Sequence, residues 1–310
     1  MSFSEALEKN KKQPRKIIMD VYTDWCGWCK HMDRTTFADP GIAAYINANY
    51  YAVKFDAEGR DSIVYKGKTY ENDGPSMRPG RKPTHPLAIE ILGGQLSYPT
   101  LVYFDDSSNV IAPIGGYRSA VDIQPFLVYF AEDLYKYVNI QTFIDDFKKT
   151  YTDSLRSNVV NIKWLTMKEA LEKNKQNPKK FLVFMQTDWC APCKIQDDIH
   201  FNDSALAKYI NENMYAVKLN ATTKDSIVFN NYTYINENKG HPFHQLAVTL
   251  LNGKMKFPNM VFITEKLEII TAVPGYFELK TLEPLVKYFN TDVFKTKKWE
   301  DYLREYSVKK

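Results

Sequence analysis

Four cysteines, the only ones in the chain, form two Cys-x-x-Cys pairs: Cys26 and Cys29 in "DWCGWCK", Cys190 and Cys193 in "DWCAPCK". Each pair follows an apolar run typical of a buried strand and is expected to open a helix. A thiol at a helix N-terminus has a lowered pKa, because unpaired backbone N–H groups favour negative charge there. Such a thiolate attacks a disulfide, and a second thiol one turn later resolves the mixed disulfide. We therefore expect Cys26 and Cys190 to be the nucleophiles, and Cys29 and Cys193 the resolving thiols.

Two other uses of these cysteines fit the sequence less well. Zinc ribbons separate their two pairs by about 15–20 residues, whereas Cys29 and Cys190 are 161 positions apart. A structural disulfide across two residues closes too small a loop to remove much chain entropy. The spacing therefore favours redox chemistry, with no metal site and no cofactor expected.

The surroundings of the two pairs are duplicated. "EALEKNKKQPRK" (5–16) recurs as "EALEKNKQNPKK" (169–180), and "AAYINANYYAVKFDA" (43–57) as "AKYINENMYAVKLNA" (207–221), both 164 positions later. Beyond Tyr70 the offset falls to 159, so the first copy has five extra residues between Glu71 and His85. Two domain-sized copies indicate a tandem duplication. We expect domains at residues 1–151 and 161–310, joined by a linker at 152–160.

Each copy alternates helix and strand. Ser2 with Glu5, and Thr166 with Glu169, have capping-box spacing and should open the first helices. The runs 17–23 and 181–187 predict buried strands before the cysteines, and hairpins are expected to turn at 66–67 and 230–231. The expected fold class is α/β, with two domains that each have a central mixed β-sheet flanked by helices.

Further helices are expected after the cysteine pair. Asp39 and Asp203 are candidate N-caps for a helix that follows the cysteine helix. A closing helix should present one apolar face, and another helix is expected at 141–149. The residues expected on the apolar face are Ile123, Phe126, Leu127, Phe130 and Leu134.

Composition excludes several classes of protein. The net charge is only +4, and Lys and Arg alternate with acids, so no nucleic-acid partner is expected. No apolar run is long enough for a membrane span.

Aligning the copies pairs Met1 with Leu165 and leaves the lead-in "NIKW" (161–164) without a counterpart. We therefore expect that an upstream segment, such as a secretion signal, has been removed, and that the protein is periplasmic or secreted, the alternative being cytoplasmic.

Both copies resemble thioredoxin-fold domains, above all those of secreted or periplasmic bacterial thioredoxin-like thiol:disulfide interchange proteins. The resemblance rests on the two cysteine motifs, the strands before them, and the later Tyr-Pro and Phe-Pro steps. It implies that Pro99 and Pro258 are cis and lie beside the cysteines. It also implies that the backbones of Tyr98 and Phe257 pair with substrate.

The same resemblance extends to the residues around the cysteines. Trp25 and Trp189 match a tryptophan that shapes the surface beside the active site. Six residues before Cys26, Asp20 matches the family's buried proton acceptor for the resolving thiol, and Lys54 matches the lysine beside it.

The second copy departs from this pattern, because Phe184 replaces the acid although Lys218 is retained. Proton removal from Cys193 should then be slower.

The sequence thus predicts a thiol–disulfide oxidoreductase that reduces or isomerises protein disulfides through both pairs. Its expected partners are disulfide-bonded proteins and an unknown thiol electron donor. The alternative is a non-catalytic peptide- or protein-binding module, with slow or vestigial redox activity in the second domain.

Overall fold

A computed structural model describes residues 1–75, 82–152 and 161–308. The chain divides into two compact units, Met1–Glu132 and Asp133–Lys310, and each is described by itself. Residues 153–160 of the predicted linker lie outside the described residues. The helix at the end of the predicted first domain is grouped with the second unit.

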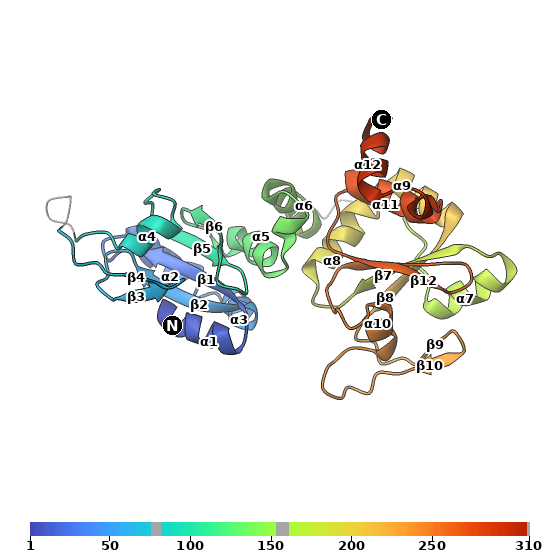
Figure 1. Cartoon of the computed structure of the whole chain (residues 1–310), viewed down its shortest axis with the longest axis horizontal. Coiled ribbons are helices and arrows are strands. Elements are labelled where there is room, and N and C mark those ends of the chain that lie inside the picture. The colour runs from blue at the N-terminus through green and yellow to red at the C-terminus, as the bar shows by residue number, and fades with distance from the viewer. Residues whose placement is uncertain (76–81, 153–160, 309–310) are drawn as a thin grey trace. The chain divides into compact units, whose positions relative to one another are not determined.

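Each unit contains a four-stranded sheet, a short hairpin and surrounding helices (Figure 1). The elements of the first unit are α1 (Phe3–Lys12), β1 (Lys16–Tyr22), α2 (Gly27–Thr35), α3 (Pro40–Asn49), β2 (Tyr50–Asp56), β3 (Ile63–Tyr65), β4 (Lys68–Tyr70), α4 (Pro86–Ile91), β5 (Thr100–Phe104), β6 (Val110–Gly115) and α5 (Ala120–Ala131). Those of the second are α6 (Ile140–Thr152), α7 (Met167–Gln176), β7 (Lys180–Gln186), α8 (Ala191–Ile195), α9 (Ser204–Asn213), β8 (Met214–Asn220), β9 (Ile227–Phe229), β10 (Tyr232–Tyr234), α10 (Gln245–Leu250), β11 (Asn259–Ile263), β12 (Ile269–Pro274), α11 (Leu279–Asn290) and α12 (Trp299–Val308).

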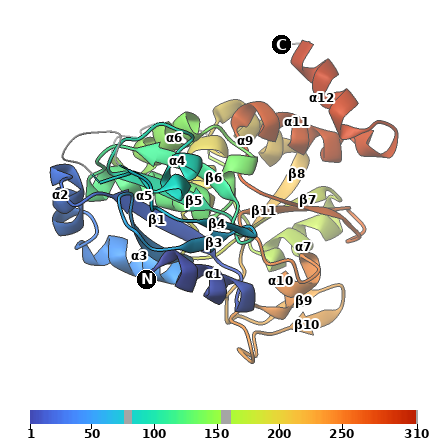
Figure 2. The same ribbon diagram turned by 60° about the vertical axis from the view of Figure 1, so that its left-hand side comes forward.

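The two large sheets have the same topology. The strand order is β2-β1-β5-β6 in the first unit and, in matching order, β8-β7-β11-β12 in the second. The strand before the cysteines is parallel to one neighbour and antiparallel to the other in each sheet. The predicted α/β class with mixed sheets flanked by helices is confirmed (Figure 2).

The alternation along β1 separates the two faces of its sheet. Ile17, Met19 and Val21 pack in the core cluster that includes residues of α1 and α4. Asp20 therefore points to the opposite face. β1 is an interior strand, so Asp20 does not lie on a water-facing edge of the sheet.

Local signals in the sequence position the elements largely as expected. Ser2 and Thr166 form complete capping boxes, and Asp39 and Asp203 cap α3 and α9. Both predicted hairpins form, and the residues at their turns have positive φ. Leu134 was expected within the closing helix, but α5 ends at Ala131 and Leu134 lies in a separate 3₁₀ turn, still buried.

Helix α6 forms where it was expected and packs within the second unit. Tyr276 donates a hydrogen bond to Asp146 of α6 at 2.9 Å, and His200 contacts the Tyr276 hydroxyl at 2.7 Å. All three side chains are buried. Burial alone would raise the pKa of Asp146, but the contacts from His200 and Tyr276 outweigh it and hold that pKa below its usual value. Phe143 adds an edge-to-face contact with the Tyr276 ring.

Candidate active site

Each cysteine pair begins a helix, and each pair forms a disulfide in the structure. Cys26 is the N-cap of α2, and its Sγ accepts the backbone N–H of Cys29 at 3.0 Å. Cys190 caps α8 in the same way, with Cys193 N–H at 3.1 Å. A sulfur that already accepts such a bond at a helix N-terminus is stabilised as a thiolate once the disulfide is reduced.

Burial distinguishes the two members of each pair. Cys26 and Cys29 are 4% and 2% exposed, and Cys190 and Cys193 are 7% and 0% exposed. All four cysteine residues are therefore buried, the first of each pair slightly less than the second. The order of nucleophile and resolving thiol stays a prediction.

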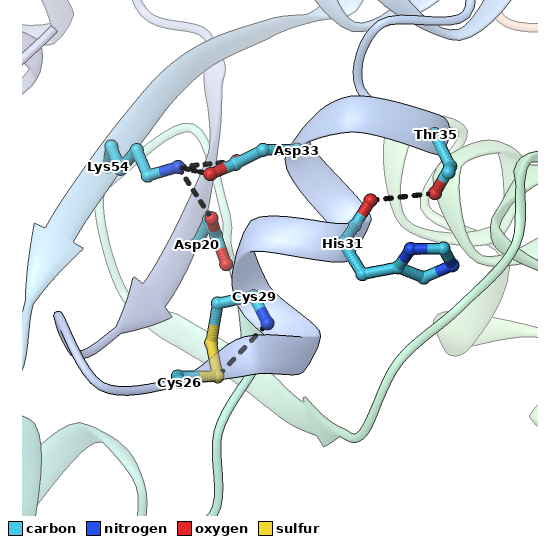
Figure 3. A network of polar contacts seen from close by, with 7 residues as sticks. All are labelled: Asp20, Cys26, Cys29, His31, Asp33, Thr35 and Lys54. Atoms are coloured by element: carbon cyan, nitrogen blue, oxygen red, sulfur yellow. Dashed lines mark hydrogen bonds and ion pairs between the residues drawn. A yellow bond between two sulfur atoms is a disulfide. The ribbon is translucent and has the colours of Figure 1, made fainter.

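Asp20 lies behind the first pair in a network of three charged side chains (Figure 3). Its Oδ2 is 3.7 Å from the Lys54 Nζ, while both Asp33 carboxylate oxygens accept hydrogen bonds from that amino group. Oδ1 of Asp20 is buried and has no hydrogen-bond partner among the described residues. In Figure 3 this second oxygen is directed toward Cys29. The arrangement leaves one oxygen of a buried carboxylate available to the resolving cysteine.

Burial raises the pKa of Asp20 to about 6. Lys54 opposes this shift and Asp33 adds to it, but loss of hydration is the largest cause. A carboxylate with a pKa near the operating pH is well matched to exchange a proton with a thiol. The geometry and the pKa together make Asp20 a candidate general base for Cys29.

The same shift predicts a pH-dependent stability. The folded first unit keeps the Asp20 proton up to about pH 6, whereas an unfolded chain releases it near 3.8. The free energy of unfolding therefore falls as pH rises from about 4 to 6 and stays lower above pH 6. The total loss is about 3 kcal/mol, because each of roughly two pH units contributes about 1.4 kcal/mol. Asp20→Asn is expected to recover up to about this much at pH 7 and little at pH 4.

Hydrogen exchange resolved by mass spectrometry would check this, because it reports on the two units separately. Peptides from the first unit should gain protection in Asp20→Asn at pH 7, while those from the second unit serve as the internal control. Unchanged or reduced protection at pH 7 would show that burial does not destabilise the ionised carboxyl.

A cavity lies beside Trp25, the residue that precedes Cys26. The peptide bond before Pro99 is cis, and the ring of Tyr98 lies 5.9 Å from that of Trp25 in an edge-on contact. Trp25 and Tyr98 line a cavity of about 420 Å³ together with Glu58, which accepts the Trp25 indole N–H at 2.9 Å. This cavity is a candidate recess for a substrate side chain.

Part of the longer loop of the first copy also lines this cavity, through residues 71–75 and 82–84. Arg78 and Arg81 of that loop lie outside the described residues. Lys82 pairs with Asp24 at 3.2 Å, which places a surface ion pair at the same rim.

The second pair has a different environment. Phe184 is fully buried at the place of Asp20, in the cluster that includes Cys190 and Cys193. The peptide bond before Pro258 is cis, and Phe257 packs against that cluster. Trp189 is 61% exposed. Lys218 pairs with Asp197, as Lys54 does with Asp33. The second site therefore keeps the cysteines and the aromatic surface but has no acid at the position of Asp20.

The helix of the second pair is also irregular. α8 ends at Ile195 and continues as a π-helical turn, Gln196–His200. The Gln196 amide accepts the Phe277 N–H at 2.7 Å and donates to the Phe277 carbonyl at 3.1 Å. These bonds fasten the cysteine helix to the loop after β12.

Two residues of the first site were not singled out from the sequence. Asp33 holds Lys54, and Glu58 fixes the Trp25 indole. A signal for Asp33 was present, because Asp197 occupies the same place in the second copy. Glu58 has no such signal, since the corresponding residue is Thr222.

Other polar residues have structural explanations. His85 and His244 are buried, and each accepts a backbone N–H at the start of a short helix, α4 or α10. Within the described ranges, no group of three or more His, Cys, Asp and Glu side chains could hold a metal ion. No helix in the described part of the chain has the length and apolarity of a membrane span.

Two family models match the chain. Residues 2–105 match Thioredox_DsbH, described as "Protein of unknown function, DUF255", and residues 167–290 match Thioredoxin_2, "Thioredoxin-like domain". With the two mixed sheets and the paired cysteines at helix starts, these matches define a tandem thioredoxin-like protein. Within that class the chain is similar to bacterial thiol:disulfide interchange proteins, as the sequence predicted.

The similarity to curated relatives covers short segments. "Thiol:disulfide interchange protein DsbD" from Pectobacterium atrosepticum is 23% identical over 125 residues, 39% of this chain and 17% of that protein. The protein of the same name from Vibrio vulnificus is 44% identical over 41 residues, 13% of this chain and 7% of that protein. The matches thus span less than a fifth of the length of either relative.

Parts of the chain align with solved structures. A "DsbH Oxidoreductase" has 19% identity and a TM-score of 0.29, covering 43% of this chain and 83% of that chain. The C-terminal domain of Neisseria meningitidis DsbD in the reduced form has 17% identity and a TM-score of 0.26, covering 42% and 95% respectively.

Proposed function

We propose that this protein is a thiol–disulfide oxidoreductase that reduces or isomerises protein disulfides, with the first unit as the better-equipped catalyst. The observation that carries the proposal is the arrangement at the first pair. Cys26 caps a helix, and a buried carboxylate with a pKa of about 6 directs a free oxygen toward Cys29.

The reaction would proceed in two thiol–disulfide exchanges. The Cys26 thiolate attacks one sulfur of a substrate disulfide, forms a mixed disulfide and releases the other substrate sulfur as a thiolate. Asp20 takes the proton from Cys29, whose thiolate then attacks Cys26 and releases the second substrate thiolate. The enzyme leaves as the Cys26–Cys29 disulfide, and a thiol electron donor must reduce it again.

The substrate would bind across the face formed by Trp25, Tyr98 and Pro99. Trp25 is 50% exposed, and the adjoining cavity offers both aromatic surface and the Glu58 carboxylate. Similarity to thiol:disulfide interchange proteins supports disulfides as substrates. We also propose a periplasmic or secreted location, as the resemblance of the sequence implied. Cell fractionation would test the location.

Cys29→Ser is expected to trap substrates, because the mixed disulfide on Cys26 then has no resolving thiol. The full chain, with its second pair replaced by serine, is incubated with insulin whose disulfides are intact. Non-reducing electrophoresis and mass spectrometry then detect the adduct. The adduct should disappear on addition of dithiothreitol. The matched control is Cys26→Ser with Cys29 intact, which should form far less adduct, and equal trapping by both variants would contradict the assigned order.

A non-catalytic role is a second candidate for the second unit alone. Phe184 at the place of Asp20 favours it, because Cys193 has no buried base at that position. On this proposal the second unit would hold substrate through Trp189, Phe257 and Pro258. A variant with all four cysteines replaced by serine should then retain affinity for reduced substrate, and loss of all affinity would rule out the holding role.

A further inference from the structure

The cavity beside Trp25, next to the first cysteine pair, has an acidic lining. Among the described residues that line it are three carboxylates and one ammonium group: Glu58, Glu71 and Asp73, and Lys82. The ammonium group is already paired, since the Lys82 Nζ lies 3.2 Å from the Asp24 Oδ2. The described part of the lining therefore carries an excess of negative charge.

Lys82 shows the sign of the electrostatic potential at this rim. Its pKa is raised, first by the hydrogen bond to Asp24 and then by the charges of Asp24, Asp56 and Glu58, although loss of hydration opposes them in part. Three carboxylates thus act on one exposed ammonium group. A cation that enters the cavity would meet the same favourable field.

Glu58 is the carboxylate with the most defined position. It is 7% exposed, and its Oε1 accepts the Trp25 indole N–H at 2.9 Å. Its other oxygen, Oε2, has no hydrogen-bond partner among the described residues. A buried carboxylate oxygen is costly unless a donor satisfies it. Because Glu58 lines the cavity, a donor bound there can supply the missing hydrogen bond.

Hydrogen bonds of Asn72 hold the wall of the cavity in place. Its amide donates to the carbonyl of Gly59 at 2.8 Å and to that of Pro83 at 2.9 Å. These bonds connect the segment after β4 to the turn after β2 and to the segment before α4. Ile89 and Leu96 complete the lining, each 44% exposed. The wall therefore offers apolar surface for an aliphatic chain and carboxylates for a charged end.

The second unit has the same frame with fewer acids. Asn236 takes the place of Asn72 and donates to the carbonyls of Thr223 at 3.0 Å and Pro242 at 2.9 Å. The corresponding side chains differ in charge: Glu58 and Glu71 correspond to Thr222 and Ile235, while Asp73 corresponds to Glu237. Because this frame also forms with neutral residues, the fold does not require Glu58 and Glu71.

An arginine side chain fits this lining better than a lysine. Its aliphatic stem can cover apolar surface, and its planar guanidinium can donate to more than one carboxylate and stack on an aromatic ring. The lysine ammonium is a more strongly hydrated point charge without a planar face. The aromatic rings of the lining are those of Trp25 and Tyr98, and Trp25 directly precedes Cys26. A side chain in the cavity would thus belong to a residue near the reacting disulfide.

We propose that the cavity beside Trp25 is a specificity pocket for an arginine of the substrate polypeptide, close in its sequence to the cysteine that Cys26 attacks. The guanidinium donates to Glu58 Oε2 and to Glu71, and its stem covers the apolar part of the wall. This inference rests on the proposed thiol–disulfide exchange at Cys26 and names the class of disulfide that this site prefers. The second unit, which lacks both acids, has no such preference.

The test compares symmetrical disulfide-linked peptides, acetyl-Ala-X-Cys-X-Ala-amide, in which X is arginine, glutamine or glutamate. The full chain, with its second pair replaced by serine, reduces each peptide with dithiothreitol as electron donor, and chromatography gives kcat/KM. Each value is divided by the rate constant for dithiothreitol alone, because a neighbouring charge also changes how fast a disulfide reacts with any thiolate. The arginine peptide should exceed the glutamine peptide by about tenfold, as for one charge-assisted hydrogen bond, and the glutamate peptide should fall below both.

Substitutions in the wall separate this pocket from a general effect of charge. Glu58→Gln combined with Glu71→Gln should reduce the arginine preference to about twofold or less. The new amide at position 58 can still accept the Trp25 indole N–H, so the wall should persist. The matched control is Glu90→Gln on α4, an exposed acid outside the cavity lining, which should keep the full preference.

The outcomes distinguish this inference from the proposed function. Equal normalised rates for the arginine, glutamine and glutamate peptides would overturn the specificity pocket and leave the proposed function intact. An arginine preference that survives in the double variant would overturn its assignment to Glu58 and Glu71. Failure to reduce any of the peptides would overturn the proposed function itself, and with it this inference.

Discussion

Replacement of Cys26 by serine is expected to abolish disulfide reduction at the first site, the largest effect of any single change in this unit. A serine hydroxyl cannot form the mixed disulfide, so no later step can follow. The measurement is insulin reduction by the full chain with dithiothreitol as the electron donor. Because the second unit has its own pair, Cys26→Ser should be measured with and without Cys190→Ser.

The double variant should show no turnover above the rate of dithiothreitol alone. Cys190→Ser by itself should keep most of the activity, because the first unit has the acid that the second has lost. Circular dichroism of each variant would establish that it is folded. Insulin reduction that persists in the folded double variant would contradict the proposed function.

Replacement of Asp20 by asparagine should give the second-largest effect. Removal of a positioned general base typically costs about 10²–10⁴-fold in rate, and we expect a loss on the order of 100-fold in the step that Cys29 performs. The amide has nearly the shape of the carboxyl, so the packing of β1 against α2 should persist. Stopped-flow measurement of mixed-disulfide resolution, with the second pair replaced by serine, isolates this step.

The pH profile distinguishes a base from a structural residue. In the wild-type protein the resolution rate should rise as pH passes through about 6, because only the ionised Asp20 can accept the proton. Asp20→Asn should lose this rise. The matched control is Leu101→Ile on the neighbouring strand, which changes packing on the same face without removing a titrating group. Wild-type resolution rates in Asp20→Asn would contradict the assignment of Asp20 as a base.

Much of the fold could be predicted because its signals are local. The capping boxes at Ser2 and Thr166 need only side chains three positions apart, and the hairpins need only two turn residues that tolerate positive φ. The position of the cysteines at helix starts follows from the buried strand that precedes them. Because the sequence is duplicated, each of these local signals occurs in both copies.

The packing of α6 could not be predicted in the same way. Its apolar spacing indicates a helix but does not identify the surface that the helix covers. That surface depends on Asp146 meeting Tyr276 and His200, which lie 130 and 54 positions later in the chain. Neither partner is singled out by a local pattern.

The sequence named the residues of the candidate site but did not indicate that two acids compete for one lysine. Asp20 and Lys54 were paired by resemblance, yet Lys54 bonds both oxygens of Asp33 and stands further from Asp20. A lysine shared in this way neutralises Asp20 less than an exclusive ion pair would. The elevated pKa of Asp20 depends on that sharing as well as on burial.

The position of α6 also determines how the chain can be divided for study. A cut in 152–160, where the sequence repeat ends, would leave α6 on the first fragment with Phe143 and Phe147 uncovered. It would also remove from the second unit the Asp146 carboxylate, which Tyr276 and His200 contact. We therefore expect fragments separated after Glu132 to be more stable than fragments cut in 152–160, because the compact units divide at Glu132 and not where the repeat ends.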